Sequence, residues 1–144
     1  MPSETIAIAA DHAGVDLKMV LKEELEVLGF EVLDLGTQGE QSVDYPDMAD
    51  ALAEAISDGG VERGVLVCGT GIGISIAANR HRHIRAAVCC DTSSARLTRE
   101  HNNANVLALG ARLIGVETAK DCLRTFLSAK FEGGRHKRRV DKMS

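Results

Sequence analysis

Aromatic residues are scarce in this chain: among its 144 residues there are three phenylalanines, one tyrosine (Tyr45) and no tryptophan. Proteins that bind nucleic acids commonly stack bases on aromatic side chains beside a positively charged surface. The formal net charge is −4, so most of the surface would repel a phosphate backbone. We therefore expect no nucleic-acid partner.

Long apolar stretches are absent as well. Near the N-terminus, where a signal peptide or membrane anchor would lie, Asp11, Asp16 and Lys18 interrupt the apolar residues. The chain has only two prolines and no evident repeat, linker or low-complexity segment. These absences predict one cytoplasmic domain over residues 1–144 with no membrane partner.

Metal and disulfide motifs are also missing. The four cysteines form no Cys-x-x-Cys pair, so free thiols in a reducing compartment are expected. His81 and His83 stand two residues apart and would not share a helix face, so we predict no metal site.

Positive charge is concentrated in the final ten residues, which contain five basic residues and one acid, Asp141. A basic end usually stays solvated, and otherwise it binds an anion. That anion is then either a nucleic acid or a small phosphate.

Five apolar runs rich in β-branched residues alternate with segments of helical period. Such alternation predicts a three-layer Rossmann-like α/β sandwich, with helices on both faces of a five-stranded parallel sheet. We expect every strand to be buried on both faces. The expected strands are 5–9, 31–35, 64–68, 85–89 and 105–109, and the expected helices are one that contains residues 17–28, then 46–57, 73–79, 93–101 and 116–131.

Ligands of open parallel sheets bind beyond the carboxyl ends of the strands, where loops and helix N-termini meet. Polar and glycine-rich segments follow all five expected strands of this chain. The residues expected at this edge are Asp11 and His12, then 36–45, 68–73, Asp91 and 110–112.

The third expected strand runs into Cys68-Gly69-Thr70-Gly71-Ile72-Gly73 and then a helix. The backbone N–H groups of such a turn can form a binding site for negative charge. The glycines alone would equally suit a tight turn that only permits close packing. Their G-x-G-x-G spacing differs from the nucleotide motif G-x-G-x-x-G, so a dinucleotide, with Asp91 on its ribose, is a weaker alternative.

Cys68 closes the strand just before these glycines. A cysteine at a strand end is most often a small buried apolar residue. Near a helix N-terminus, however, a thiol ionises more readily and can serve as a base. Proton abstraction beside a carbonyl requires such a base and a place for the developing oxyanion. Cys68 and the amides that follow it offer both.

A series of motifs extends over essentially the whole chain: Asp11-His12, Asp44-Tyr45-Pro46, residues 68–79, His101-Asn102, residues 105–110, Arg112 and residues 133–139. Together they resemble the ribose-5-phosphate isomerase B family, the RpiB/LacA/LacB group of sugar-phosphate isomerases. The resemblance implies a cofactor-independent intramolecular oxidoreductase, an aldose-ketose isomerase that works through an enediolate.

The resemblance also implies a substrate class. D-ribose 5-phosphate and D-ribulose 5-phosphate, a pair of the pentose phosphate pathway, are the first expectation. Erythrose 4-phosphate and allose or galactose 6-phosphate are alternatives, because the sequence does not give the depth of the pocket. A non-catalytic nucleotide-binding module is the weaker alternative from another functional class.

Individual residues receive roles from this resemblance. Cys68 would move the proton between C1 and C2, and Thr70 would assist at the reacting oxygens. His101, with Asp11 nearby, would open the furanose ring. The enediolate and sugar would contact Gly69, Gly71, Ile72, Gly73, Asn102, His12 and Tyr45. The phosphate would be bound by His12, Arg112, Arg135 and Arg139, since a guanidinium can bind a phosphate through two hydrogen bonds.

The predicted fold separates these residues. The last helix leads away from the carboxyl edge for about fifteen residues, or roughly 22 Å, so Arg135 would begin at the wrong end of its own subunit. His101 also ends a returning helix. A two-fold homodimer, in which His101 and the basic tail at about 133–144 complete the partner's site, resolves the difficulty. A tetramer built from such dimers is the open alternative.

Two positions depart from the family pattern. Ser93 stands where many members have an aromatic residue, which would alter the preferred sugar length, and the doubled thiol Cys89-Cys90 has no evident use. In some relatives a glutamate of the loop replaces the cysteine as base. Residues 72–76 contain no acid here, so Cys68 is the candidate base.

Overall fold

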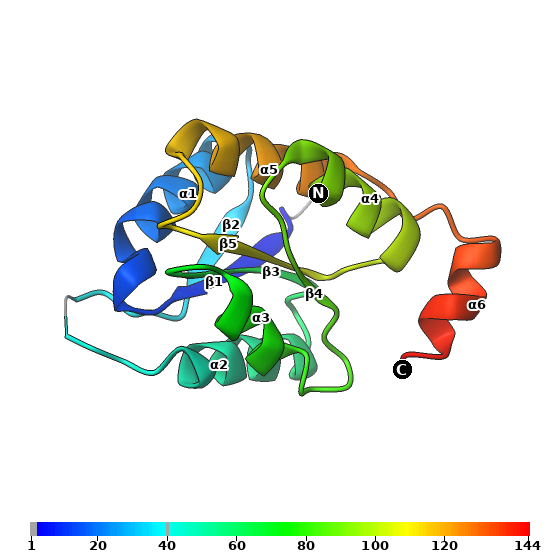
Figure 1. Cartoon of the computed structure of the whole chain (residues 1–144), viewed down its shortest axis with the longest axis horizontal. Helices are drawn as coiled ribbons and strands as arrows, with labels where there is room; N and C mark the ends of the chain where they lie inside the picture. Colours follow the sequence, from blue (N-terminus) through cyan, green and yellow to red (C-terminus); the bar gives the residue numbers. More distant parts are fainter. Residues whose placement is uncertain (1–2, 40) are drawn as a thin grey trace.

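The computed structural model describes residues 3–39 and 41–144 (Figure 1). Strands and helices alternate along the chain as the sequence predicted. The strands are β1 (Thr5–Ala10), β2 (Glu31–Asp34), β3 (Arg63–Cys68), β4 (Ala86–Val88) and β5 (Val106–Gly110). A short 3-10 helix, η1 (His12–Gly14), precedes α1 (Val15–Val27), and the other helices are α2 (Tyr45–Ser57), α3 (Ile72–Ala78), α4 (Thr92–Asn102), α5 (Val116–Ser128) and α6 (Arg135–Asp141).

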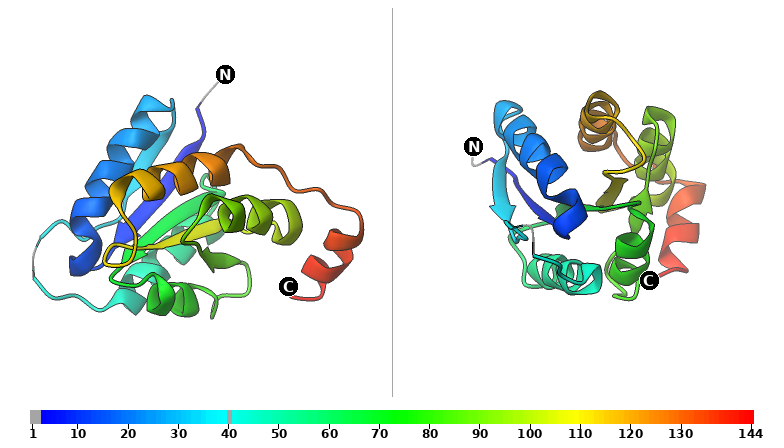
Figure 2. Two further views of the ribbon diagram at one scale, coloured as in Figure 1. Left: turned by 45° about the horizontal axis from the view of Figure 1, so that its top comes forward. Right: turned by 60° about the vertical axis from the view of Figure 1, so that its left-hand side comes forward.

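All neighbouring strands pair in parallel, in the order β2-β1-β3-β5-β4. The connections through α1 and α4 step one way across the sheet, and those through α2 and α3 step the other way. Helices α1, α4 and α5 cover one face, and α2 and α3 cover the other (Figure 2). This arrangement arises when all crossovers have the same hand. The predicted three-layer Rossmann-like sandwich is confirmed.

Strand β3 lies at the point of the sheet where the loops after neighbouring strands lead to opposite faces. Helix α3, which follows β3, covers one face, whereas α1 and α5, which follow the neighbouring strands β1 and β5, cover the other. Ligand sites of open α/β sheets occur at such switch points, because the loops turn away from each other there. Cys68, the last residue of β3, is therefore at the place where such a fold binds its ligand.

Each face of the sheet has its own apolar core. Leu25 of α1 and Phe126 of α5 are fully buried against one face, and Leu52 of α2 and Ile74 of α3 against the other. Burying one such side chain contributes about 1.5–3 kcal/mol. The two cores fix the helices on which the polar loops are mounted.

Burial of every strand on both faces was predicted, and this is wrong for β2 and β4. Strands β1, β3 and β5 are almost wholly buried, whereas β2 exposes Glu31 and Leu33, and Val88 of β4 is 37% exposed. These two are the edge strands of the sheet. An apolar run favours a strand, but its position in the sheet decides the burial.

The C-terminal region also differs from the expectation. Helix α5 ends at Ser128 rather than at residue 131, and α6 forms within the segment predicted as a basic tail. Gly133 and Gly134 precede α6 with φ of +69° and +55°, a conformation that favours glycine. In the described ranges 3–39 and 41–144, no helix has both the length and the apolar character needed to cross a bilayer.

Candidate active site

The glycine-rich loop after β3 folds over the sulfur of Cys68. The residue is only 4% exposed, and the Gly71 N–H donates to its Sγ at 3.1 Å. Gly71 has a φ of +77°, which side chains rarely permit, and this turn directs the amide at the sulfur. A backbone donor therefore contacts the atom that we predicted to accept the proton.

Some glycines of this edge are required for packing. A Cβ on Gly110 would lie 2.5 Å from the Thr70 carbonyl oxygen, and one on Gly71 would lie 2.8 Å from the Leu109 backbone. The Ala111 N–H also donates to the Cys68 carbonyl oxygen at 2.9 Å. The loops after β3 and β5 are thus locked together at backbone contact.

Other glycines make room for polar side chains. A Cβ on Gly69 would lie 3.3 Å from Nη1 of Arg112, and one on Gly73 would lie 2.7 Å from the ring of Tyr45. Arg112 is held there because its N–H donates to the Gly69 carbonyl oxygen at 2.9 Å. The packing interpretation and the binding-site interpretation of the glycines therefore apply at different positions of one loop.

The loops after β1 and β2 enclose a cavity of about 400 Å³ beside this glycine-rich loop. Asp11 is 7% exposed and accepts from the Ala13 N–H at 3.0 Å, and the exposed His12 accepts through Nδ1 from the Val43 N–H at 3.2 Å. Tyr45 contacts both the cavity and Gly73. The lining residues are Asp11, His12 and 42–47; Cys68 lies beneath the adjoining loop and is not one of them.

A fully buried lysine supports the second loop, and sequence reasoning missed it. Nζ of Lys18 donates to Oδ1 of Asp34 at 2.7 Å, and the Gly36 N–H donates to the same oxygen at 3.0 Å. Burial alone would raise the pKa of the Asp34 carboxyl, but the hydrogen bonds from Lys18 and Gly36 outweigh it and lower the pKa below its ordinary value. The pair fixes the point where the chain leaves β2 toward the cavity.

The carboxyl end of the sheet thus brings together most of the predicted site. Thr70 is exposed, and its Oγ1 accepts from the Ile72 N–H at 3.2 Å. The residues gathered at this end are Cys68, Thr70, Asp11, His12, Tyr45, Gly69, Gly71, Ile72, Gly73 and Arg112.

The remaining predicted residues lie at the other end of the sheet. Asn102 lines a cavity of about 390 Å³ together with Ala86, the first residue of β4. His101 precedes it at the end of α4, and the exposed Arg135 and Arg139 belong to α6, far from the loop after β2 (Figure 1). Within one protomer the structure does not bring these residues to Cys68.

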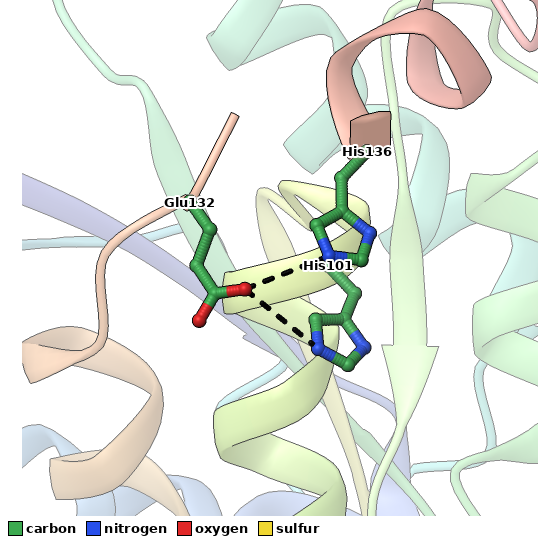
Figure 3. A group of neighbouring side chains, drawn as sticks. All are labelled: His101, Glu132 and His136. Atoms are coloured by element: carbon green, nitrogen blue, oxygen red, sulfur yellow. Dashed lines mark ion pairs between the residues drawn. The ribbon is translucent and has the colours of Figure 1, made fainter. Parts of the chain in front are cut away.

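His101 has two partners that sequence reasoning missed. Its ring stacks on that of His136, with centroids 4.3 Å apart and planes inclined by 11°, and Glu132 contacts both rings (Figure 3). The only sequence signal was the four-residue spacing of Glu132 and His136. Their approach to His101 depends on the turn at Gly133 and Gly134, which spacing does not reveal.

The other candidate metal ligands and the dinucleotide acid are engaged locally. Nε2 of His81 lies 2.7 Å from Oδ1 of Asp50, and Nε2 of His83 lies 2.8 Å from the Ala53 carbonyl oxygen, so both contact α2. Asp91, the acid of the dinucleotide alternative, accepts from the Ser94 N–H at 2.7 Å and caps α4.

All four cysteines are free thiols. Burial raises the pKa of Cys89, and it raises the pKa of Cys122 to about 11, so these two are held in the uncharged form at neutral pH. Cys90 is exposed, and nothing in the structure assigns the doubled thiol a function.

Comparison with known proteins gives matches along nearly the whole chain. The family described as Ribose/Galactose Isomerase matches residues 6–143. The ribose-5-phosphate isomerase B of Escherichia coli (strain K12) is 48% identical over 136 residues, which cover 94% of this chain and 91% of that protein. The D-erythrulose-4-phosphate isomerase of Pectobacterium atrosepticum is 49% identical over 141 residues, 96% of this chain and 92% of that protein.

Solved structures agree with these matches. A ribose 5-phosphate isomerase from Thermotoga maritima superposes with a TM-score of 0.94 at 53% identity, covering 96% of this chain and 96% of that chain. The similarity therefore extends over both ends of the sheet, from β1 to α6.

Proposed function

This chain belongs to the Ribose/Galactose Isomerase family, and we propose that it interconverts D-ribose 5-phosphate and D-ribulose 5-phosphate without a cofactor. The observation that carries the proposal is the position of Cys68. Its sulfur lies at the switch point of the sheet, accepts the Gly71 N–H, and adjoins a loop flanked by Arg112 and Tyr45.

The proposed reaction moves two protons within the sugar, one from C2 to C1 and one from O2 to O1, and creates no net charge. Once the sugar is open, the Cys68 thiolate takes the proton from C2, and the charge that develops on O1 lies at the amides of residues 69–73. The same thiol returns the proton to C1, while Thr70 assists the transfer from the C2 hydroxyl to O1. An enediolate is the intermediate of both directions.

Ring opening precedes this step for an aldose that is cyclic in solution. His101 would give a proton to the ring oxygen O4 as the C1–O4 bond breaks, and Asp11 would take the proton of the O1 hydroxyl as the carbonyl forms. Asn102 would hold sugar hydroxyls through its side-chain amide.

The site is proposed to be completed across a two-fold axis in a cytoplasmic homodimer. His12 and Arg112 would bind the phosphate from one subunit, and Arg135 and Arg139 from the other. The support is the separation within one protomer: His101, Asn102 and α6 lie at the opposite end of the sheet from Cys68, and Asn102, Arg135 and Arg139 are exposed. Residues 1–144 would form one domain whose basic end reaches the partner.

A four-carbon substrate is the second candidate, because the Pectobacterium relative named for erythrulose 4-phosphate is as similar as the E. coli one. Erythrose 4-phosphate cannot close a furanose ring, since its 4-hydroxyl carries the phosphate. A protein that acts only on it would not need a ring-opening group. The stacked, acid-paired His101 therefore favours a cyclic substrate.

A panel of aldose phosphates of four, five and six carbons in deuterated buffer tests the proposal. NMR should report ketose formation and deuterium beside the carbonyl, fastest for ribose 5-phosphate. The absence of both ketose formation and exchange with every one of the sugars would contradict the isomerase assignment. Turnover of erythrose 4-phosphate alone would replace the five-carbon substrate by the four-carbon one.

A further inference from the structure

The side chains around His101 form a cluster that the proposed reaction does not yet use. Nε2 of His136 lies 3.5 Å from Oε1 of Glu132, and Nε2 of His101 lies 3.9 Å from the same oxygen (Figure 3). The His136 side chain is 12% exposed, whereas His101 is 40% exposed. One imidazole is thus an inner, covered ring, and the other is presented outward on top of it.

The chain builds this arrangement with specific backbone contacts. The Glu132 N–H donates to the Glu100 carbonyl oxygen at 3.0 Å, which attaches the segment before α6 to the end of α4. Gly134 then has φ +55° and ψ −131°, a conformation that residues with a side chain rarely adopt. The reversal carries His136 over His101, so two helices that are separate in the sequence supply one ring pair.

The surroundings of the inner ring keep it uncharged. Burial lowers the pKa of His136, and the neighbouring His101 and Arg135 lower it further, with a smaller effect of Arg139; Glu132 opposes the shift. Two positive imidazoles stacked at 4.3 Å would repel each other strongly. The outer ring lies near the Glu132 carboxylate, with Nε2 of His101 3.9 Å from Oε1.

The geometry does not suit a metal ion, although the three ligand-type atoms lie within 4.8 Å of one another. An imidazole binds a metal through a lone pair in the plane of its ring. Two rings in nearly parallel, stacked planes cannot direct their lone pairs at one ion. A role in orienting His101 fits the ring planes better.

We propose that His136 and Glu132 are positioning residues for ring opening: His136 supports the His101 ring by stacking, and Glu132, whose Oε1 lies 3.9 Å from Nε2 of His101, orients the ring that gives its proton to O4. This inference rests on the proposed isomerase function. It confines both residues to the step in which the C1–O4 bond breaks, and it excludes them from the proton transfer at Cys68.

Two substrates separate these steps. Ribose 5-phosphate is cyclic in solution and must be opened, whereas ribulose 5-phosphate cannot close a furanose ring because its 5-hydroxyl carries the phosphate. Turnover of ribose 5-phosphate therefore needs His101, and deuterium exchange at C1 of ribulose 5-phosphate needs only Cys68 and its loop. The exchange rate also reports whether a variant is folded.

His136→Ala and Glu132→Gln should lower kcat for ribose 5-phosphate by about 10- to 100-fold, because a misplaced catalytic group loses about that much. Exchange on ribulose 5-phosphate should stay within about twofold of the wild type. His136→Phe keeps a stacked ring that cannot be charged, and it should recover most of the loss of His136→Ala. Asp121→Ala, an exposed change on α5 outside the proposed site, is the control and should alter neither rate.

Equal losses on both substrates would overturn the inference, because the residues would then act on the whole site or on its stability. No loss in His136→Ala, or an equal loss in His136→Phe, would overturn the role of stacking. If the wild type neither converts ribose 5-phosphate nor exchanges deuterium into ribulose 5-phosphate, the proposed function fails, and this result is distinct from a failure of the positioning role.

Discussion

The two ends of the sheet hold their polar side chains in different ways. At the carboxyl end, Cys68 is 4% exposed and the surrounding loops meet at backbone contact, with a glycine wherever a Cβ would collide. At the amino end, His101 is 40% exposed and Glu132 is 53% exposed, and they are held by one stacked ring and one backbone hydrogen bond.

This difference indicates different tasks. A group that must move a proton to and from carbon needs a fixed geometry, which close backbone packing supplies. In the proposed dimer, groups that act on a neighbouring subunit must be presented outward instead. The exposed side chains of the amino end meet this requirement, and neither end carries the complete set of predicted residues.

Cys68→Ala should produce the largest effect, because it removes the only proposed base. We expect kcat to fall by about 1,000-fold or more on both cyclic and open-chain sugars, within the range of general acid–base catalysis. Deuterium exchange at C1 of ribulose 5-phosphate measures the loss. Cys90→Ala removes an exposed thiol and should leave the exchange rate unchanged. Activity retained in Cys68→Ala would contradict the proposal that the carboxyl end supplies the base.

Asp34→Asn tests how firmly the carboxyl end is held. It leaves the buried Lys18 without a counter-charge, which should cost about 3 kcal/mol of unfolding free energy at neutral pH. Because the folded pKa of Asp34 is depressed, its stabilisation is present above the ordinary value of 3.8 and is lost as the pH falls through the lower folded value. Urea denaturation of the wild type and of Asp34→Asn should therefore give unfolding free energies whose difference becomes smaller in acid.

The control for this change is Asp141→Asn, whose carboxylate pairs with Lys137 at the exposed amino end. An exposed pair should contribute less than about 1 kcal/mol. If the difference in unfolding free energy between the wild type and Asp34→Asn instead grows in acid, it would contradict the lowered pKa of Asp34.

Gly110→Ala tests the backbone contact between the loops. Its Cβ would lie 2.5 Å from the Thr70 carbonyl oxygen, so the loop over Cys68 must shift. We expect kcat to fall by about 10- to 100-fold. At Gly39 no described residue other than its chain neighbours lies within 4 Å of an added Cβ, so Gly39→Ala should have no effect. Equal rates for the two variants would show that the close packing is unimportant for activity.

Arg139→Ala should give a smaller change, confined to binding. Loss of a hydrogen bond to a charged phosphate costs about 1.5–3 kcal/mol, so KM should rise by at least about 10-fold with little change in kcat. Steady-state kinetics measure both constants. Arg138→Ala on the same exposed helix should change neither constant. An equal rise in the KM of Arg138→Ala would show that the helix acts only through its positive charge and that Arg139 has no specific role.

The sequence predicted the carboxyl end better than the amino end, for a physical reason. Strand, loop and helix follow one another locally there, so the apolar runs and the spacing of the glycines already indicate that Cys68 and Asp11 share an edge. The burial of Lys18 was not predicted, since its partner Asp34 comes from a strand whose place at the sheet edge is a property of the whole fold.

At the amino end the contacts are longer in range. Helix α6 was not predicted because a run of basic residues after two glycines is typical of a solvated end. The stacking of His136 on His101 follows only from the conformation of Gly134 and from the attachment of Glu132 to α4. The shared site itself was predicted from helix lengths, and it stays a prediction.

A mixing experiment tests that central prediction most directly. Cys68→Ala and His101→Ala each damage a different end, so random hybrid dimers of the two would contain one site with both groups intact. Mixed in equal amounts under conditions that exchange subunits, they should regain about a quarter of the wild-type turnover of ribose 5-phosphate. Turnover no greater than the sum of the two separate variants would contradict a site completed by the partner.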